Sequence, residues 1–410
     1  MRTSADNDSL YGRVRSFARR LAAPLVGLLL CCLLDPLPAR GQEPFYPTGG
    51  QSPFWGRTEY LLWYVERFST PPLLTTSPAD TDEDVAGVLG EPNTGLLIGN
   101  GAPGAWPRPG ARTSLGYWFD PGRRFGIQGS YAAVWRDTWR SSVESQGDPI
   151  LARPFLNVEP GSEGQDAELL AFEDLWEGST EVTRETSFQG ADVLLRSNVY
   201  RNPWRHLDFL MGWRFNRLND CLSIADFITA VGPETGMVEG TTIDRLDRFE
   251  TSNSFNGGEL GLVAETRRGD WTLEILAKVA LGNTHSRVEI SGLTTTTVPM
   301  PDADPDVAVT PAGLLAQETN IGVYEKDDFA VIPELGLTLG YDLGPGVRLT
   351  LGYSVLYWSE VARPGGAVDL GLNLSQLEVG GLVGPERPQF AWVGDDVWVH
   401  GVLLGLDWRY

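Results

Sequence analysis

Two aspartate-rich segments place carboxylates at every second residue. The first segment holds Asp80, Asp82 and Asp84, and the second holds Asp302, Asp304 and Asp306. Because Ca²⁺ prefers a shell of several oxygen ligands, this spacing predicts calcium sites in exposed loops. Neither segment has the central glycine and distal glutamate of an EF-hand loop, so a solvated acidic loop is the competing interpretation.

The chain has three histidines, which raises the question of a surface hydrolase. His285 and His400 are expected near the outer ends of strands, where His400 could pair with Asp395 or Asp396 as a general base. The sequence contains no Gly-x-Ser-x-Gly, no His-Glu-x-x-His and no phosphate-binding glycine loop. We therefore predict that the protein is not an enzyme, with a surface hydrolase as the least favoured alternative.

A third group of charged residues lies at alternate positions of apolar segments. Its members are Asp208, Arg214, Glu259, Glu274, Lys278, Glu334 and Arg348. Successive side chains of a strand point to opposite faces, so a sheet closed into a barrel would bring these charges into its lumen and turn residues such as Phe209 and Met211 toward lipid. In a narrow tube the charges would either line a channel or pair with one another and close it.

The segments that could form strands alternate with short and long links. Ten strands are predicted near residues 57–66, 112–120, 124–136, 184–200, 205–217, 255–266, 270–281, 328–342, 347–359 and 397–410. The short links, which contain Gly or Pro, are 120–123, 200–204, 267–270 and 343–346, and the long links are 67–111, 137–183, 218–254, 282–327 and 360–396. Outer-membrane barrels have short periplasmic turns and long external loops. We predict an all-β, antiparallel transmembrane barrel of about ten strands, or twelve if one loop holds another hairpin.

The two ends of the chain agree with export to the outer membrane. A cluster of arginines precedes the apolar run 21–34, and Ala39-Arg40-Gly41 is a plausible cleavage site, so residues 1–41 are predicted to be a signal peptide. Residues 42–54 would form a periplasmic segment and residues 55–410 a single barrel domain in the cell outer membrane. The final Gly405-x-x-Trp408-x-Tyr410 resembles the signal read by the barrel-assembly machinery, which we expect as a partner together with outer-membrane lipid.

Composition narrows the classes of ligand. The formal net charge is −22, which argues against a nucleic-acid partner, because phosphate binding needs clustered Lys and Arg. If the lumen conducts, the acidic excess predicts a preference for cations. Cys221 is the one cysteine beyond the predicted signal peptide, so no intramolecular disulfide is expected.

Several segments are similar to those of a known family. Residues 54–64 (FWGRTEYLLWY), 257–262, 280–285, 313–322 and 353–359 resemble the β-barrel porin family 7, BBP7, of planctomycete bacteria. The resemblance implies an outer-membrane barrel and supplies no catalytic residues. The predicted function is a narrow passive channel for small solutes or ions, and the alternative, ahead of the hydrolase, is a plugged scaffold that displays large external loops. The oligomeric state is not indicated.

Overall fold

The computed structural model describes residues 52–104, 106–301, 303–377 and 381–409. The predicted signal peptide and the last residue, Tyr410, lie outside these ranges. Within the described ranges, no helix is long and apolar enough to cross a membrane.

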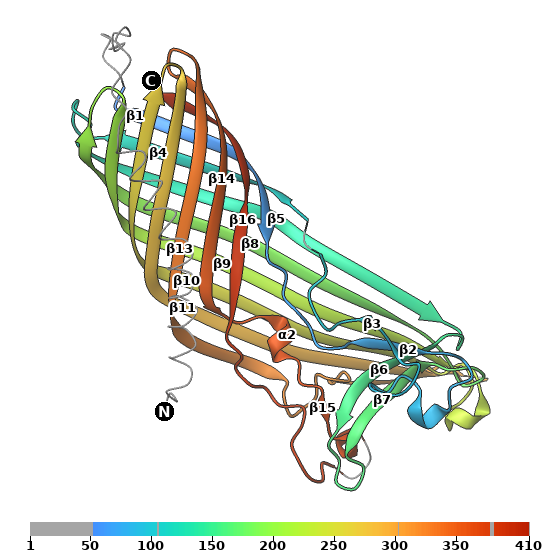
Figure 1. Ribbon diagram of the computed structural model, residues 1–410. Coiled ribbons are helices and arrows are strands. Elements are labelled where there is room, and N and C mark those ends of the chain that lie inside the picture. The colour runs from blue at the N-terminus through green and yellow to red at the C-terminus, as the bar shows by residue number, and fades with distance from the viewer. Residues whose placement is uncertain (1–51, 105, 302, 378–380, 410) are drawn as a thin grey trace.

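Ten antiparallel strands close into a ring (Figure 1). They are β1 (Phe54–Val65), β4 (Arg108–Trp118), β5 (Phe125–Ser145), β8 (Trp176–Arg201), β9 (Arg205–Ala230), β10 (Thr242–Arg268), β11 (Trp271–Val298), β13 (Gly322–Gly344), β14 (Val347–Val361) and β16 (Asp395–Arg409). Because β1 pairs with β4 on one side and with β16 on the other, the ring has no free edge near its short turns. The predicted all-β barrel and its ten strands are confirmed, and within the described ranges no further hairpin joins the ring to make twelve.

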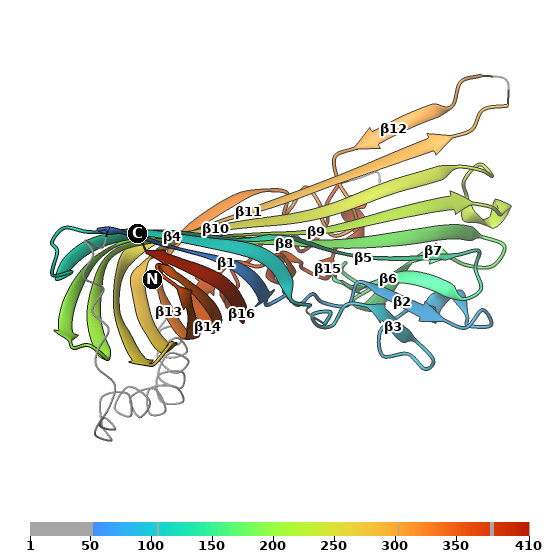
Figure 2. The ribbon, with the colours of Figure 1, turned by 90° about the horizontal axis from the view of Figure 1, so that it is seen from above.

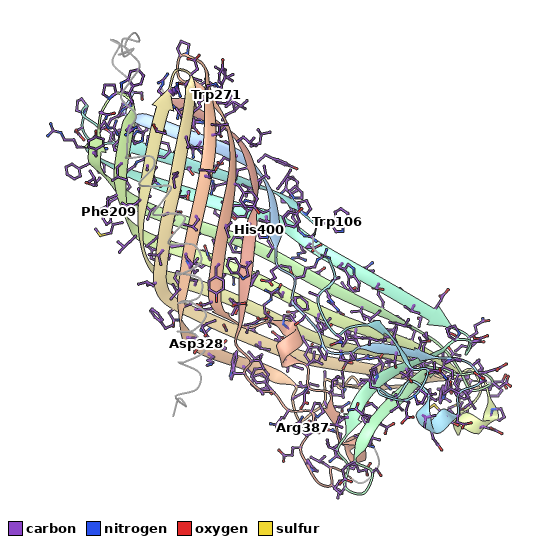
Figure 3. The ribbon with its side chains drawn as sticks, in the orientation of Figure 1. Trp106, Phe209, Trp271, Asp328, Arg387 and His400 are labelled. Atoms are coloured by element: carbon purple, nitrogen blue, oxygen red, sulfur yellow. The ribbon has the colours of Figure 1, made fainter. Side chains whose placement is uncertain are left out.

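An apolar band covers the outside of the ring next to the short turns. On β9, for example, Phe209, Met211 and Trp213 are 37–49% exposed and point outward. The band ends at a row of polar residues paired across five strands: Gln189, Arg217, Ser254, His285 and Asp327. Between this row and the short turns, each of these five strands has 12 or more residues, which exceeds the roughly 9–11 that a tilted strand needs to cross a bilayer. Figure 3 shows Trp271 at the short-turn end and Arg387 among the segments at the other end, which we call the loop end.

Strands β5 and β8–β11 continue beyond this polar row as one extended sheet (Figure 2). Much of links 218–254 and 282–327, predicted as long loops, is therefore strand, and this part of the prediction is wrong. The inward apolar alternation persists, as at Leu222, Ile224 and Phe249, which are fully buried. The outward residues change from apolar to polar, for example at Arg248 and Glu250. The strands continue past the polar row, but their lipid-facing apolar pattern stops there. The prediction ended the strands where this pattern stops, which caused the error.

The other long links form a second layer over the inner face of the extended sheet (Figure 1). It contains a small sheet of β2 (Leu74–Ser77), β3 (Gly95–Ile98), β6 (Ile150–Asn157), β7 (Gly164–Ala171) and β15 (Gly371–Leu372), and the short helix α2 (Pro364–Ala367). The links also contain three 3-10 turns, η1 (Glu83–Val85), η2 (Pro233–Thr235) and η3 (Leu374–Leu377). The short strand β12 (Asp306–Thr310) pairs with β11. Buried residues of both layers, such as Leu74, Phe155, Ile224 and Phe249, form one core. The links are thus a packed layer and not free loops.

Candidate functional site

The inside of the barrel holds a layer of buried ion pairs at about the middle of the apolar band. This central layer consists of Glu59, Arg112, Asp192, Arg214, Glu259, Lys278 and Glu334. Arg214 Nη1 donates to Glu259 Oε1 at 2.7 Å and to Glu334 Oε2 at 2.6 Å, and Lys278 Nζ donates to Asp192 Oδ2 at 2.9 Å. The alternation of seven strands brings these groups together, because each contributes one inward charge.

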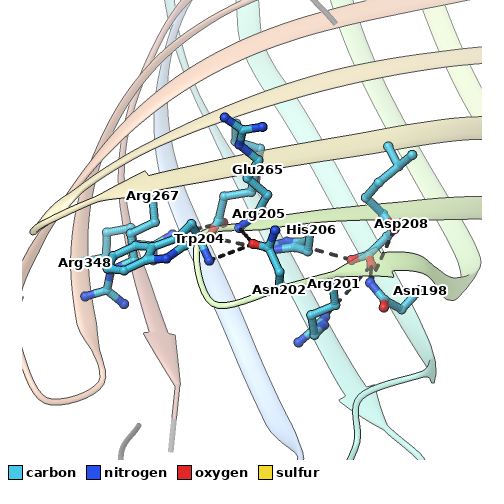
Figure 4. A network of polar contacts seen from close by, with 12 residues as sticks. Asn198, Arg201, Asn202, Trp204, Arg205, His206, Asp208, Glu265, Arg267 and Arg348 are labelled. Atoms are coloured by element: carbon cyan, nitrogen blue, oxygen red, sulfur yellow. Dashed lines mark hydrogen bonds and ion pairs between the residues drawn. The ribbon is translucent and has the colours of Figure 1, made fainter. Parts of the chain in front are cut away.

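Another group of buried charges inside the barrel lies nearer the short turns (Figure 4). Arg57 bonds Asp407 at 2.5 Å and Glu274 at 2.6 Å, and Arg196 bonds Asp208 at 2.6 Å. Arg348, which is paired with Asp407 in the register of β14 and β16, lies 3.1 Å from Glu265 and 2.7 Å from Asp342. Each acid is matched by an arginine, as buried charges require.

The structure brings all seven residues predicted for the lumen into these two layers. Arg214, Glu259, Lys278 and Glu334 belong to the central layer, and Asp208, Glu274 and Arg348 to the layer near the short turns. Sequence analysis missed Arg57, Glu59 and Arg112. The alternation of Arg57 and Glu59 with the outward Thr58 and Tyr60 was the available signal. All these charges are paired, and their role as lining of a conducting pore stays a prediction.

On the loop side of the central layer, apolar side chains fill the lumen. This apolar plug includes Leu61, Trp63, Val134, Phe188, Leu218, Phe255, Ala280, Ile332, Leu356, Trp358, Val399 and Leu403, and nine of the ten strands contribute to it. Trp358 is fully buried, its ring lies 6.3 Å from that of Phe255, and its Nε1 donates to Thr284 Oγ1 at 3.0 Å. A barrel of this strand number encloses little more than its own side chains, and on the loop side of the central layer these include the large apolar ones.

A cavity of about 140 Å³ remains between the plug and the short-turn end. Trp63, Phe188 and Leu356 of the plug close it on the loop side. Its lining carries eight basic and six acidic side chains, with His206 counted as neutral. The acidic lumen predicted from the net charge is therefore not found in this cavity. Many carboxylates of the chain, such as Glu83 and Asp84 of η1, lie outside the ring.

At the loop end, burial shifts the pKa values of two side chains, Cys221 and Arg184. Burial raises the pKa of the Cys221 thiol to about 11, with Glu250 and Glu185 nearby opposing ionisation. Burial also lowers the pKa of Arg184 to about 10, and the charge of Arg67 adds to this shift. The Arg184 guanidinium lies 5.0 Å from the centre of the Trp139 ring and donates to Thr70 Oγ1 at 2.7 Å.

The predicted calcium segments receive no support from geometry. In the part of the chain that the structure describes, no group of three or more His, Cys, Asp or Glu side chains could hold a metal ion. Asp80, Asp82 and Asp84 lie around η1, Asp304 and Asp306 lie at the start of β12, and Asp302 is outside the described residues. Calcium binding stays a prediction.

The histidines do not form the arrangement considered for a hydrolase. His400 faces the outside of β16, where its Nδ1 lies 2.7 Å from Tyr353 Oη and its ring stacks on Tyr64 rather than meeting Asp395 or Asp396. His285 instead lies 3.2 Å from Asp327 in the polar row on the outer wall. Hydrogen bonds from Asn283 and His285 lower the pKa of Asp327.

Two solved structures of outer-membrane proteins have low similarity to this chain. The outer membrane protease OmpT from Escherichia coli has 8% sequence identity and a TM-score of 0.40, and the match covers 89% of this chain and 99% of that chain. A Pseudomonas aeruginosa FadL homologue has 9% identity and a TM-score of 0.21, with 87% and 89% covered. At such scores these likenesses carry no argument about activity. No curated protein matches the chain.

A family model is decisive where these structures are not. The model described as "Putative beta barrel porin-7 (BBP7)" matches residues 55–410, which is the whole of the predicted barrel domain. The resemblance noted in segments of the sequence is therefore confirmed, and an outer-membrane location follows from the family. The chain belongs to the beta barrel porin-7 family.

Proposed function

We propose that this protein is a closed outer-membrane barrel that carries a rigid binding platform at its loop end. The observation that supports this function best is the apolar plug. Its residues are at most 5% exposed and come from nearly every strand of the ring. An ion that crossed such a region would lose its hydration without gaining polar ligands, which is how apolar constrictions stop conduction.

The ion-pair layers make the wall of the lumen beside the plug rigid. Arg214 and Lys278 each contact two or three carboxylates of the central layer. Separating a buried pair leaves an uncompensated charge, which costs about 3–5 kcal/mol. Side chains of this layer therefore stay in place, and the lumen acts as a core that stiffens the barrel.

The platform is the extended sheet together with the small sheet packed on it. Arg153 of β6 is 1% exposed and bonds acids of both β9 and β10, so the two layers are fixed to each other. Binding residues commonly lie on connecting segments that a rigid scaffold positions. The chain matches this description, because its links form an ordered layer outside the apolar band.

A narrow channel is the second candidate. The family description and the cavity at the short-turn end favour it, since only the plug separates this cavity from the loop end. In this reading the plug would have to move before solutes pass. We propose no catalytic role for either arrangement.

Single-channel recording in planar bilayers tests the proposal. We expect no unit conductance steps from wild-type protein whose folding is shown by heat-modifiable migration on a gel. The double variant Trp358→Ala/Phe255→Ala should conduct, because it removes two rings that pack together in the plug, whereas the control Trp106→Ala, which removes a ring that is 75% exposed, should not. Stable steps from the wild type would reject the closed barrel and favour the channel. A potassium chloride gradient would then test the cation preference predicted from composition.

A further inference from the structure

We propose that the mouth of the cavity at the short-turn end binds a phosphate-class oxyanion. Three arginines, which we call the mouth arginines, meet there: Arg123, Arg201 and Arg409. They come from the turn after β4, the end of β8 and the end of β16, and all three line the same cavity. This site lies at the opposite end of the barrel from the proposed platform and is independent of it.

Among the residues that the structure describes, the mouth arginines lack dedicated carboxylate partners. Arg201 lies 3.9 Å from Asp208, which Arg196 already bonds at 2.6 Å. Arg409 lies 3.7 Å from Glu265, which Arg348 already bonds at 3.1 Å. Both acids are thus shared with a closer arginine, and positive charge at the mouth is in excess.

Arg123 has no ion pair among the residues that the structure describes. Burial lowers the pKa of its guanidinium, and the nearby charges of Arg409 and Arg201 lower it further. An anion placed between the three groups would remove this repulsion. The three like charges therefore favour the binding of an anion at the mouth.

The turn that carries Arg123 is built to hold it in place. Asp120 Oδ1 accepts hydrogen bonds from the backbone N–H groups of Arg124 and Phe125 at 2.8 and 3.0 Å. Arg123 has a φ of +52°, a conformation that residues other than glycine rarely adopt. Such backbone outliers persist where the surroundings impose them and are frequent at ligand sites.

Two tryptophans form a wall behind the arginines. The Arg201 guanidinium lies 5.7 Å from the centre of the Trp118 ring, and that of Arg196 lies 5.4 Å from Trp118 and 5.6 Å from Trp55. Stacking of this kind restrains a guanidinium while its N–H groups stay available. Both rings line the cavity, so a bound anion should change their fluorescence.

Shape and chemistry together select the ligand class. The fork of N–H groups on arginine matches the oxygen geometry of phosphate. At about 30 Å³ for each water, the cavity has room for four or five water-sized groups. One phosphate group fits in this space, and the second phosphate of pyrophosphate, or the rest of a larger phosphorylated molecule, would stay outside the mouth.

Calorimetric titration of the folded protein with pyrophosphate, in an uncharged detergent, tests the site. We expect saturable binding of one pyrophosphate per chain that weakens as salt is raised, and a parallel change in tryptophan fluorescence. The double variant Arg123→Gln/Arg201→Gln should bind at least about tenfold more weakly. The control Arg268→Gln removes an exposed arginine at the same end that does not line the cavity, and it should bind as the wild type does.

Absence of saturable binding by the wild type, or equal losses in the control and the double variant, would overturn the proposal. If the double variant does not fold, Arg123→Gln alone replaces it, because Arg123 lies in a turn outside the strands. Nanodiscs of phosphatidylcholine and of phosphatidylglycerol distinguish the source of the phosphate. Weaker pyrophosphate binding in phosphatidylglycerol, in the wild type but not in the variant, would identify a lipid headgroup, and equal binding in both nanodiscs would identify a soluble ligand.

Discussion

Arg153 and Asp226 join the two layers of the loop end through a fully buried ion pair. Arg153 Nη1 on β6 donates to Asp226 Oδ2 on β9 at 2.7 Å, and Arg153 Nη2 lies 3.2 Å from Asp247 on β10. The other oxygen of Asp247 accepts from the backbone N–H groups of Leu315 and Ala316 at 2.9 and 2.8 Å. One arginine therefore connects the small sheet, the extended sheet and a connecting segment.

Replacement of Arg153 should weaken the attachment of the small sheet to the extended sheet. We expect Arg153→Met to lower the free energy of unfolding by about 3–5 kcal/mol, because Asp226 and Asp247 would stay buried without a cation. Guanidinium unfolding followed by tryptophan fluorescence measures the change. The control Arg140→Met breaks the exposed pair with Glu181 and should cost less than about 1 kcal/mol. Equal effects of the two variants would show that the buried pair does not hold the layers together.

The two lysines of the chain should differ in reactivity. Lys278 lies in the central layer with its side chain 6% exposed, whereas Lys326 is 43% exposed beside Asp328. An amine-reactive ester should modify Lys326 of the folded protein at least about tenfold faster, since Lys278 is paired and shielded from solvent. Peptide mass spectrometry reads both rates, and unfolded protein serves as the control. Similar rates in the folded state would indicate that water and reagent enter the lumen freely.

Cys221 should be slow to alkylate at neutral pH. The reactive species is the thiolate, and with a pKa of about 11 roughly one thiol in a thousand is ionised at pH 8. Because the pKa is raised, the rate should increase about tenfold for each pH unit between pH 8 and pH 10. Iodoacetamide labelling of the Cys221 peptide measures this profile. A plateau already reached near pH 9, as in the unfolded chain, would contradict the raised pKa.

Two glycines allow close approach of strands, and they can be compared. A Cβ at Gly405 would lie 2.6 Å from Glu59 Cγ and 2.8 Å from Thr350 Oγ1, whereas a Cβ at Gly258 would meet nothing closer than 4.0 Å. Gly405→Val should therefore cost about 1–3 kcal/mol and reduce the folded fraction on a heat-modifiability gel, with Gly258→Val close to wild type. The same gel for Trp408→Ala in cells tests the assembly signal proposed from Gly405, Trp408 and Tyr410. Normal folding of Gly405→Val would show that the strand pair β1–β16 tolerates a side chain there.

Much of the barrel could be predicted from the sequence, because its cause is local. Alternation such as Phe209, Met211 and Trp213 against Asp208 and Arg214 assigns each residue of a strand to one of two faces. Short turns with Gly or Pro then determine which strands are neighbours. The number of strands, their order and the inward position of the seven charged residues all follow from this local pattern.

Only the tertiary structure decided what the inside of the barrel contains. Whether Lys278 lines a pore or pairs with Asp192 depends on how far apart opposite walls of the ring lie, and no local pattern contains that distance. The apolar plug and the second layer at the loop end arise in the same way. Closure of the ring brings Trp358 to Phe255, which is about a hundred residues away in the sequence. Packing of the links on the extended sheet brings Arg153 to Asp226. The sequence by itself therefore determined the frame and its faces, and three-dimensional packing decided which side chains meet inside the lumen.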